Sequence, residues 1–105
     1  EFDTAMRHNI PIVSIIGNDA GWGQIRNPQV AILGEQASLA TDLDLTHYEK
    51  IVQALGGYGE FVTEPKKIVP ALERAFQSGK PACVNVAIDP TTLRGEVNIM
   101  RGLSI

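Results

Sequence analysis

Short apolar runs alternate along the chain with longer stretches whose apolar residues recur at helical spacing. The runs are short enough to be strands, and the first, IVSII, is β-branched enough to be buried on both faces of a sheet. The stretches between the runs have the three- and four-residue spacing of amphipathic helices. We therefore predict strands at 12–16, 60–63 and 81–89, and helices at 1–7, 47–55 and 65–78.

The order of these elements predicts the fold class. Strands separated by helices need crossover connections, which produce a parallel sheet with helices on both of its faces. We expect an α/β fold, a three-layer α/β/α arrangement with a mostly parallel sheet. The residues predicted to be buried are Tyr48, Ile51, Val52 and Leu55 in the second helix, and Ile68, Val69, Leu72 and Phe76 in the third.

Local signals mark where these helices begin and end. Asn9 is placed to adopt a left-handed conformation after the first helix. Thr46 and Glu49 form a capping box at the start of the second helix, with Thr46 as N-cap. Pro70 would remove a backbone bond inside the third helix, so this helix either begins near Lys67 or bends. The other ends are expected at Gly56, Pro65 and Gly79.

The pattern is weaker between the first and second helical stretches after Gly17, which ends the first apolar run. We predict a short helical turn at 24–26, interrupted by Pro28, and a long surface loop over 27–44 with a single helical turn. The segment 90–105 has no clear period. It is predicted to be an irregular tail after an α/β domain that spans residues 1–89.

Composition and charge restrict the classes of function. The chain has 105 residues, a formal net charge of −3 and a pI near 5.2, which argues against nucleic acid or an anionic membrane as its main partner. No apolar run is long enough for a membrane helix. Cys83 is the only cysteine, so no intrachain disulfide is possible, and we expect an inert thiol in the core of a cytoplasmic protein.

The turn after the first strand, 18–23, contains the strongest candidate chemistry. Asn18 and Asp19 supply side-chain oxygens, and a tight turn would expose the carbonyl of Gly21; oxygen ligands of this kind suit Mg²⁺. The same residues also fit a plain Asn-Asp turn held by hydrogen bonds to its own backbone. Gly21 and Gly23 would let a pyrophosphate approach a helix N-terminus, although the G-x-G-x-x-G pattern is absent.

The remaining candidates are better explained as structural residues. Trp22 is typical of a core or interface anchor, and His8 of a solvated helix end. His47 lies on the polar side of the capping box. Arg26 has the chemistry to bind an anion but more often does nothing specific at such a position. Paired carboxylates, a Ser/His/Asp set and a zinc pattern are missing from the sequence, so no catalytic residue is predicted.

Several stretches together resemble a known family. These are EFDT at 1–4, Arg7, Pro11 with the strand that leads into NDAGWG at 18–23, and GKPA at 79–82. They resemble the pyrophosphate-binding domain of thiamine-diphosphate-dependent enzymes, in the group of acetolactate synthase, benzaldehyde lyase and 2-hydroxyacyl-CoA lyase. The resemblance covers most of the chain and implies part of the thiamine-diphosphate-binding fold.

The resemblance also implies a set of site residues. Trp22 falls at the aromatic position that closes the family's metal motif, Asn18 at its first asparagine and Asp19 at its second. The second position supplies the Mg²⁺ side-chain ligand, and Gly21 supplies a backbone carbonyl; Asn18 is expected to shape the turn. This chain departs from the family by having Asp19 where asparagine is usual, which brings extra negative charge close to a diphosphate. Asn18, Asp19, Gly21, Trp22 and Gly23 are thus implied to bind thiamine diphosphate.

What the resemblance implies for the whole protein extends beyond this chain. The Gly-Asp-Gly half of the metal motif and the activating glutamate of the family are not in the sequence, so we expect a piece of a longer polypeptide that is inactive by itself. The parent is expected to be a homodimer or homotetramer that makes or breaks carbon–carbon bonds in small 2-oxo or 2-hydroxy acyl substrates. Exposed apolar side chains are expected where missing parts dock, at Phe2, Met6, Ile99, Met100 and Leu103.

Two other classes remain open on the residues alone. One is a non-catalytic α/β regulatory or interaction domain, in which the Asn-Asp turn is only a turn. The other is a flavodoxin-like nucleotide module, which the lack of a Ser/Thr-rich or glycine-rich phosphate loop disfavours.

Overall fold

The computed structural model describes residues 1–90, and these form two compact units. The first unit contains Glu1–Asn18 and His47–Ile88. The second contains Asp19–Thr46 together with Asp89 and Pro90. The predicted tail lies outside the described residues except for Pro90, as do Ile99, Met100 and Leu103.

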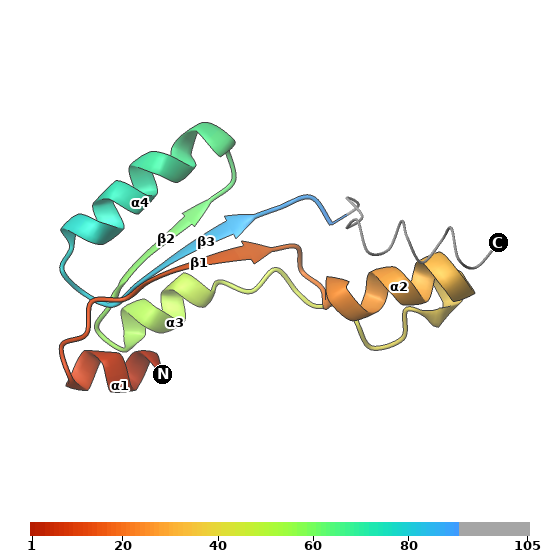
Figure 1. The fold of residues 1–105 in the computed structure, drawn as a ribbon, viewed down its shortest axis with the longest axis horizontal. Coiled ribbons are helices and arrows are strands. Elements are labelled where there is room, and N and C mark those ends of the chain that lie inside the picture. Colours follow the sequence, from red (N-terminus) through yellow and green to blue (C-terminus); the bar gives the residue numbers. More distant parts are fainter. Residues whose placement is uncertain (91–105) are drawn as a thin grey trace. The chain divides into compact units, whose positions relative to one another are not determined.

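The first unit is built on a three-stranded parallel sheet (Figure 1). Its strands are β1 (Val13–Asn18), β2 (Tyr58–Val62) and β3 (Ala82–Ala87), in the order β1-β3-β2. The predicted parallel sheet is confirmed. Strand β1 runs two residues further than predicted, because Gly17 and Asn18 still pair with Val86 and Ala87 of β3.

Helices cover both faces of this sheet, as a three-layer α/β/α arrangement requires. Helix α4 (Ile68–Gln77) packs on one face and α3 (Tyr48–Ala54) on the other (Figure 1). Helix α1 (Phe2–Arg7) precedes β1, and a 3₁₀ turn, η2 (Pro65–Lys67), leads into α4. Phe2 and Met6 of α1 are half-buried rather than exposed, and Ala5 is buried.

The apolar core lies between α4 and the sheet. Ala71 and Ala75 are the buried residues of α4, whereas Val69 and Phe76, which were predicted to be buried, are 62% and 69% exposed. The two alanines lie on the sheet side, where small side chains let the helix backbone approach the strands closely. A stripe inferred from the largest apolar residues was therefore wrong for two of its four members. The core cluster contains Val62, Ala71, Ala75, Ala82, Val84 and Val86, with Val13, Tyr58, Ile68 and Leu72 packed against it.

Helix α3 differs from its prediction at both its start and its buried face. Its N-cap is His47, and no side chain makes a cap hydrogen bond, so the predicted Thr46–Glu49 capping box is wrong. The carboxylate of Glu49 turns inward instead and is buried together with Val52. Ile51 and Leu55, two members of the predicted stripe, are exposed because Glu49 takes the position that faces the sheet.

The predicted C-terminal ends of α1, α3 and α4 are confirmed, whereas Pro65 begins the 3₁₀ turn that precedes α4. Asn9, Gly56 and Gly79 all have positive φ, at 54°, 100° and 65°. Helix α4 begins at Ile68, which places Pro70 in its first turn, where a missing N–H removes no intrahelical hydrogen bond.

The second unit is more regular than the predicted long loop. Helix α2 (Gly23–Leu33) is followed by a 3₁₀ turn, η1 (Glu35–Ala37), and an isolated antiparallel bridge joins Gly21 to Asp42. Pro28 lies inside α2, so the prediction that it would end a short turn was wrong. Proline removes only its own donor to the carbonyl four residues earlier, and the chain continues helical to Leu33.

Within residues 1–90, no helix has both the length and the apolar character needed to cross a membrane.

Candidate functional site

The turn that follows β1 places a carboxylate at the start of a helix. Ala20 has a φ of 54°, which turns the chain sharply after Asp19 so that α2 begins at Gly23, only four residues later. A Cβ atom at position 23 would lie 2.8 Å from Oδ2 of Asp19 and 3.4 Å from Nδ2 of Asn27. The Asp19 carboxylate therefore lies against the first turn of α2, where unpaired backbone amides favour negative charge.

A returning segment holds the turn in shape. The amide of Trp22 donates to the carbonyl of Thr41, and the amide of Leu43 donates to the carbonyl of Ala20, each at 2.8 Å. The Ala20 carbonyl is thereby occupied. Among residues 1–90, no backbone amide donates to the carbonyl oxygen of Gly21. The carbonyl oxygen of Gly21 and the carboxylate oxygens of Asp19 can therefore both coordinate a cation.

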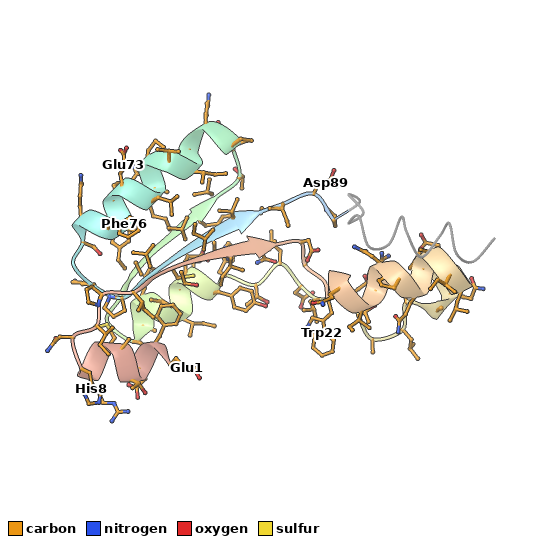
Figure 2. The ribbon with its side chains drawn as sticks, viewed as in Figure 1. Glu1, His8, Trp22, Glu73, Phe76 and Asp89 are labelled. Carbon is orange, nitrogen blue, oxygen red and sulfur yellow. The ribbon has the colours of Figure 1, made fainter. Side chains whose placement is uncertain are left out.

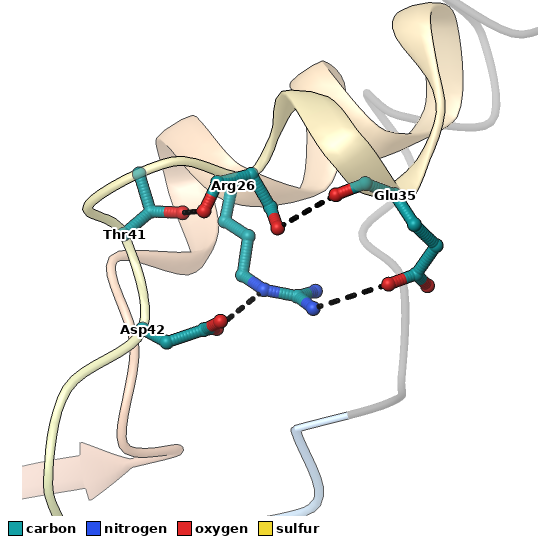
Figure 3. Close-up of polar contacts among 5 residues, drawn as sticks. Arg26, Glu35, Thr41 and Asp42 are labelled. Carbon is teal, nitrogen blue, oxygen red and sulfur yellow. Dashed lines mark hydrogen bonds and ion pairs between the residues drawn. The ribbon is translucent and has the colours of Figure 1, made fainter.

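A side-chain ion pair also joins the returning segment to helix α2 (Figure 3). Nε of Arg26, in the first turns of α2, donates to Oδ1 of Asp42 at 2.6 Å. A second nitrogen of the guanidinium lies 4.0 Å from Oε2 of Glu35. Arg26 therefore has a specific partner, which the sequence did not indicate, and it links α2 to the residue that bridges with Gly21.

The turn lines a pocket of about 550 Å³ within the second unit. Asp19, Gly21, Gly23 and Arg26 all contribute to its wall, as do Asp42 and Leu43. The described residues contain no cluster of three or more His, Cys, Asp or Glu side chains that would hold a metal ion by itself. Two protein oxygens beside a pocket fit Mg²⁺, which takes few protein ligands and completes its shell with water and phosphate oxygens.

Comparison with known families identifies the domain. Residues 1–86 match the family described as "Thiamine pyrophosphate enzyme, C-terminal TPP binding domain". The chain belongs to this family. Its domain binds thiamine pyrophosphate (TPP, the same compound as thiamine diphosphate), so the predicted family, fold and cofactor are confirmed.

Known relatives agree with this assignment. The acetolactate synthase large subunit IlvG of Mycobacterium tuberculosis is 49% identical over 92 residues, which cover 87% of this chain and 16% of the relative. The 2-hydroxyacyl-CoA lyase 2 of Bos taurus is 39% identical over 99 residues, covering 90% of this chain and 15% of that protein. The Caenorhabditis elegans protein of the same name is 38% identical over 106 residues, covering 94% of the chain and 16% of the relative. The chain thus spans about one sixth of the length of these relatives.

The predicted site residues of the TPP domain fall into two groups. Asp19, Gly21, Trp22 and Gly23 lie together in the second unit. Trp22 is not a core anchor: its indole is 58% exposed and stands away from the start of α2 (Figure 2). Asn18, by contrast, is the last residue of β1 and is buried in the first unit.

Asn18 begins a chain of buried polar side chains that the sequence analysis did not detect. Its Nδ2 donates to Oδ1 of Asn85 at 3.1 Å, and Nδ2 of Asn85 donates to Oε2 of Glu49 at 2.8 Å. Nδ1 of His47 lies 2.7 Å from Oε1 of the same carboxylate. The available signal was Asn85 itself, a polar residue between two valines in an otherwise apolar strand.

The environment of Glu49 keeps it charged. Burial alone would raise the pKa of this carboxyl, but hydrogen bonds from Asn85, from a backbone amide and from His47, together with the charge of His47, hold the pKa below its ordinary value. Since an ionised carboxylate only accepts hydrogen bonds, Nδ1 of His47 carries a proton. The imidazole is partly exposed, and its ring meets the edge of Phe61 with centroids 4.7 Å apart.

Cys83 and His8 lie where the sequence predicted, in the core and at an exposed helix end. Cys83 is fully buried on β3, and burial followed by the nearby charge of Glu49 raises the pKa of its thiol. A thiol with a raised pKa in an apolar site is unreactive. His8 is exposed beyond the end of α1.

Proposed function

We propose that this chain anchors the diphosphate end of TPP through Mg²⁺, as part of a longer enzyme that makes or breaks carbon–carbon bonds next to a carbonyl. The observation that carries the proposal is the placement of the Asp19 carboxylate against the first turn of α2, beside the Gly21 carbonyl and an open pocket. Relatives named acetolactate synthase and 2-hydroxyacyl-CoA lyase support 2-oxo or 2-hydroxy acyl compounds as substrates.

In this proposal, each residue of the turn has a separate task. The carboxylate of Asp19 and the carbonyl oxygen of Gly21 are Mg²⁺ ligands. Gly23 leaves room for the Asp19 carboxylate against the first turn of α2. Trp22 and Gly23 lie on the cofactor side, and Asn18, which donates to Asn85, fixes the point at which the turn leaves β1.

The charge balance of the site follows from the aspartate at position 19. Asp19 adds a full negative charge where the family usually has a neutral asparagine. Arg26 does not offset this charge freely, because its guanidinium already contacts Asp42 and Glu35. We infer that Mg²⁺ itself is the main neutralising charge, so cofactor affinity in this protein depends strongly on Mg²⁺ concentration.

The chemical step lies outside this chain. TPP, when bound, supplies a thiazolium ring that stabilises a carbanion, while the protein supplies binding, orientation and electrostatics. The residues of this chain hold one end of the cofactor, and no catalytic residue is assigned among them. We propose that residues 1–89 are part of the pyrophosphate-binding domain, and that the intact protein is a cytoplasmic homodimer or homotetramer.

The test is binding of Mg²⁺–TPP to the full-length protein by calorimetry. We expect Asp19→Ala to weaken binding by more than the roughly 10- to 100-fold that loss of an outer-shell partner costs a metal site. High Mg²⁺ and high cofactor should partly restore activity. Asp19→Asn keeps a side-chain oxygen and should retain most of the affinity.

The control is Asp44→Ala, which removes an exposed carboxylate from the same unit. It should leave cofactor binding unchanged. If Asp19→Ala binds Mg²⁺–TPP as tightly as the wild type, the assignment of this turn is wrong. If the wild-type protein itself binds no TPP, the alternative of a non-catalytic α/β interaction domain gains support.

A further inference from the structure

The buried polar chain in the first unit connects three secondary structure elements. Asn18 comes from the end of β1, Asn85 from β3 and Glu49 from α3, and they are 6%, 0% and 3% exposed. These residues are far apart in the sequence, since Asn85 is 67 residues from Asn18 and 36 from Glu49. The contacts are therefore tertiary, and they are made on the face of the sheet that α3 covers.

The hydrogen bonds of the buried polar chain all donate toward Glu49. An ionised carboxylate has no proton to donate, so Glu49 requires the Nδ2 group of Asn85 to face it. The Oδ1 atom of Asn85 must then face Asn18, and only Nδ2 of Asn18 can donate to it. The charge of Glu49 thus determines the orientation of two side-chain amides in succession.

The ends of this polar chain coincide with the ends of the segment that contains the cofactor-anchoring turn. Asn18 immediately precedes Asp19, and His47, whose ring contacts Glu49, immediately follows Thr46. Residues 19–46 leave the first unit at Asn18 and return to it at His47. Both attachment points are therefore held by the same buried carboxylate, Asn18 through Asn85 and His47 directly.

Burying these groups is not the arrangement that core packing alone would favour. Asn85 lies between Val84 and Val86, and an apolar side chain there would avoid the cost of burying an amide. Fully paired polar groups in a core restrict it to one arrangement, because any shift leaves a buried donor or acceptor without a partner. The main effect of the polar chain is therefore to fix the position of Asn18, and its contribution to the free energy of unfolding is secondary.

We propose that Asn85 and Glu49 are positioning residues for the Mg²⁺–TPP anchor: they hold Asn18 and His47, and thereby fix where the segment 19–46 begins and ends. This inference rests on the function proposed above for Asp19 and Gly21. Neither Asn85 nor Glu49 contacts the cofactor. They act through Asn18, which is covalently joined to the metal-binding residue.

The experiment compares buried substitutions on one strand of the full-length enzyme. Asn85→Leu removes both amide bonds at similar volume, and we expect the KM for Mg²⁺–TPP to rise about tenfold or more while kcat at saturating cofactor stays within about twofold. Cys83→Ala is the matched control, since Cys83 is equally buried, two residues away and on the same face of β3. It should lower the melting temperature without changing the cofactor KM.

A conservative variant provides the rescue. Glu49→Gln keeps an oxygen that accepts from Nδ2 of Asn85, and a neutral His47 can accept from the new amide, so the cofactor KM should stay close to wild type. If Asn85→Leu does not fold, Asn85→Ala removes both amide bonds without adding bulk. We expect it to raise the cofactor KM as Asn85→Leu does.

The outcomes separate this inference from the proposed function. If Asp19→Ala leaves cofactor binding unchanged, the proposed function itself fails. If Asp19→Ala weakens binding while Asn85→Leu, or Asn85→Ala in its place, changes only the melting temperature, as Cys83→Ala does, then Asn85 is structural and the inference is overturned. A KM raised equally by Cys83→Ala would also overturn it, because any core defect would then have the same effect.

Discussion

The Asp19 carboxylate lies so close to Gly23 that no side chain fits between them, because a Cβ at position 23 would stand 2.8 Å from Oδ2. This contact places a negative charge against the N-terminal turn of α2. The crowding atom is the end of a flexible side chain, so Asp19 can move aside if position 23 grows. The contact between Asp19 and position 23 therefore affects the orientation of the carboxylate more than the stability of the fold.

Gly23→Ala should accordingly separate cofactor affinity from stability. We expect Mg²⁺–TPP affinity of the full-length protein to fall, because Asp19 must rotate away from its position, while the melting temperature changes little. Gly17→Ala is the control, since a Cβ there would meet only Ile88 at 3.4 Å, an ordinary contact. Calorimetry and thermal unfolding of both variants decide the matter, and equal affinities would contradict the role given to Gly23.

We expect Arg26 and Asp42 to support the turn through their mutual ion pair, so that losing either residue has the same effect on cofactor binding. Since Asp42 is largely exposed, we expect each single substitution, Arg26→Gln or Asp42→Asn, to cost below about 1 kcal/mol of stability. Both should weaken cofactor binding, and the double variant should be no weaker than the worse single one. Additive losses in this double-mutant cycle would instead mean that Arg26 and Asp42 affect cofactor binding independently.

The Glu60–Arg74 pair on β2 and α4 predicts a dependence of stability on pH. Hydrogen bonds from Arg74, at 2.7 and 2.9 Å, hold the pKa of Glu60 below its ordinary value. A carboxyl with a lowered pKa in the folded state stabilises the fold above its unfolded pKa of about 4.3. That contribution is lost as the pH falls through the folded-state value.

Glu60→Gln tests this dependence. The variant should have a lower melting temperature than wild type at pH 7, and the difference should shrink as the pH is lowered through the acidic range. A difference that stays constant with pH would show that the pair contributes no charge-dependent stability. Glu64→Gln, which removes a half-exposed carboxylate that pairs with Lys66 and Lys67, serves as control.

The 105-residue chain by itself should bind Mg²⁺–TPP very weakly. It provides two of the proposed metal ligands, and in its described residues no group of acidic and histidine side chains can hold the ion alone. Calorimetry on the isolated chain should show no saturable binding in the micromolar range. Micromolar affinity would mean that this turn anchors the cofactor without the other half of the metal motif.

The sequence predicted the parallel sheet and the residues that end α1, α3 and α4, because each of these ends depends on a local signal. Asn9, Gly56 and Gly79 terminate helices through their own backbone conformations, and each has the positive φ that their position implied. Pro70 also indicated that the helix begins near Lys67 or bends, since proline is tolerated in the first turn of a helix. Pro28 was not, because propensity alone does not reveal that a helix will continue past it.

Side-chain partners could not be predicted, because they depend on tertiary contacts. Glu49 fitted a capping box locally, yet its carboxylate is buried against Asn85, 36 residues away. Arg26 showed no partner until the chain brought Asp42 back from 16 residues further on. The stripe on α4 failed for a similar reason, since the sheet packs against Ala71 and Ala75 rather than against the largest apolar residues.

The most direct measurement is a crystal structure of the full-length protein with TPP and Mg²⁺, with Mn²⁺ substituted to locate the ion by its anomalous scattering. We expect one metal ion bonded to a carboxylate oxygen of Asp19 and to the carbonyl oxygen of Gly21, at about 2.0–2.1 Å for Mg²⁺. The cofactor diphosphate should contact the same ion. A metal ion bound to the diphosphate but to neither Asp19 nor Gly21 would contradict this expectation.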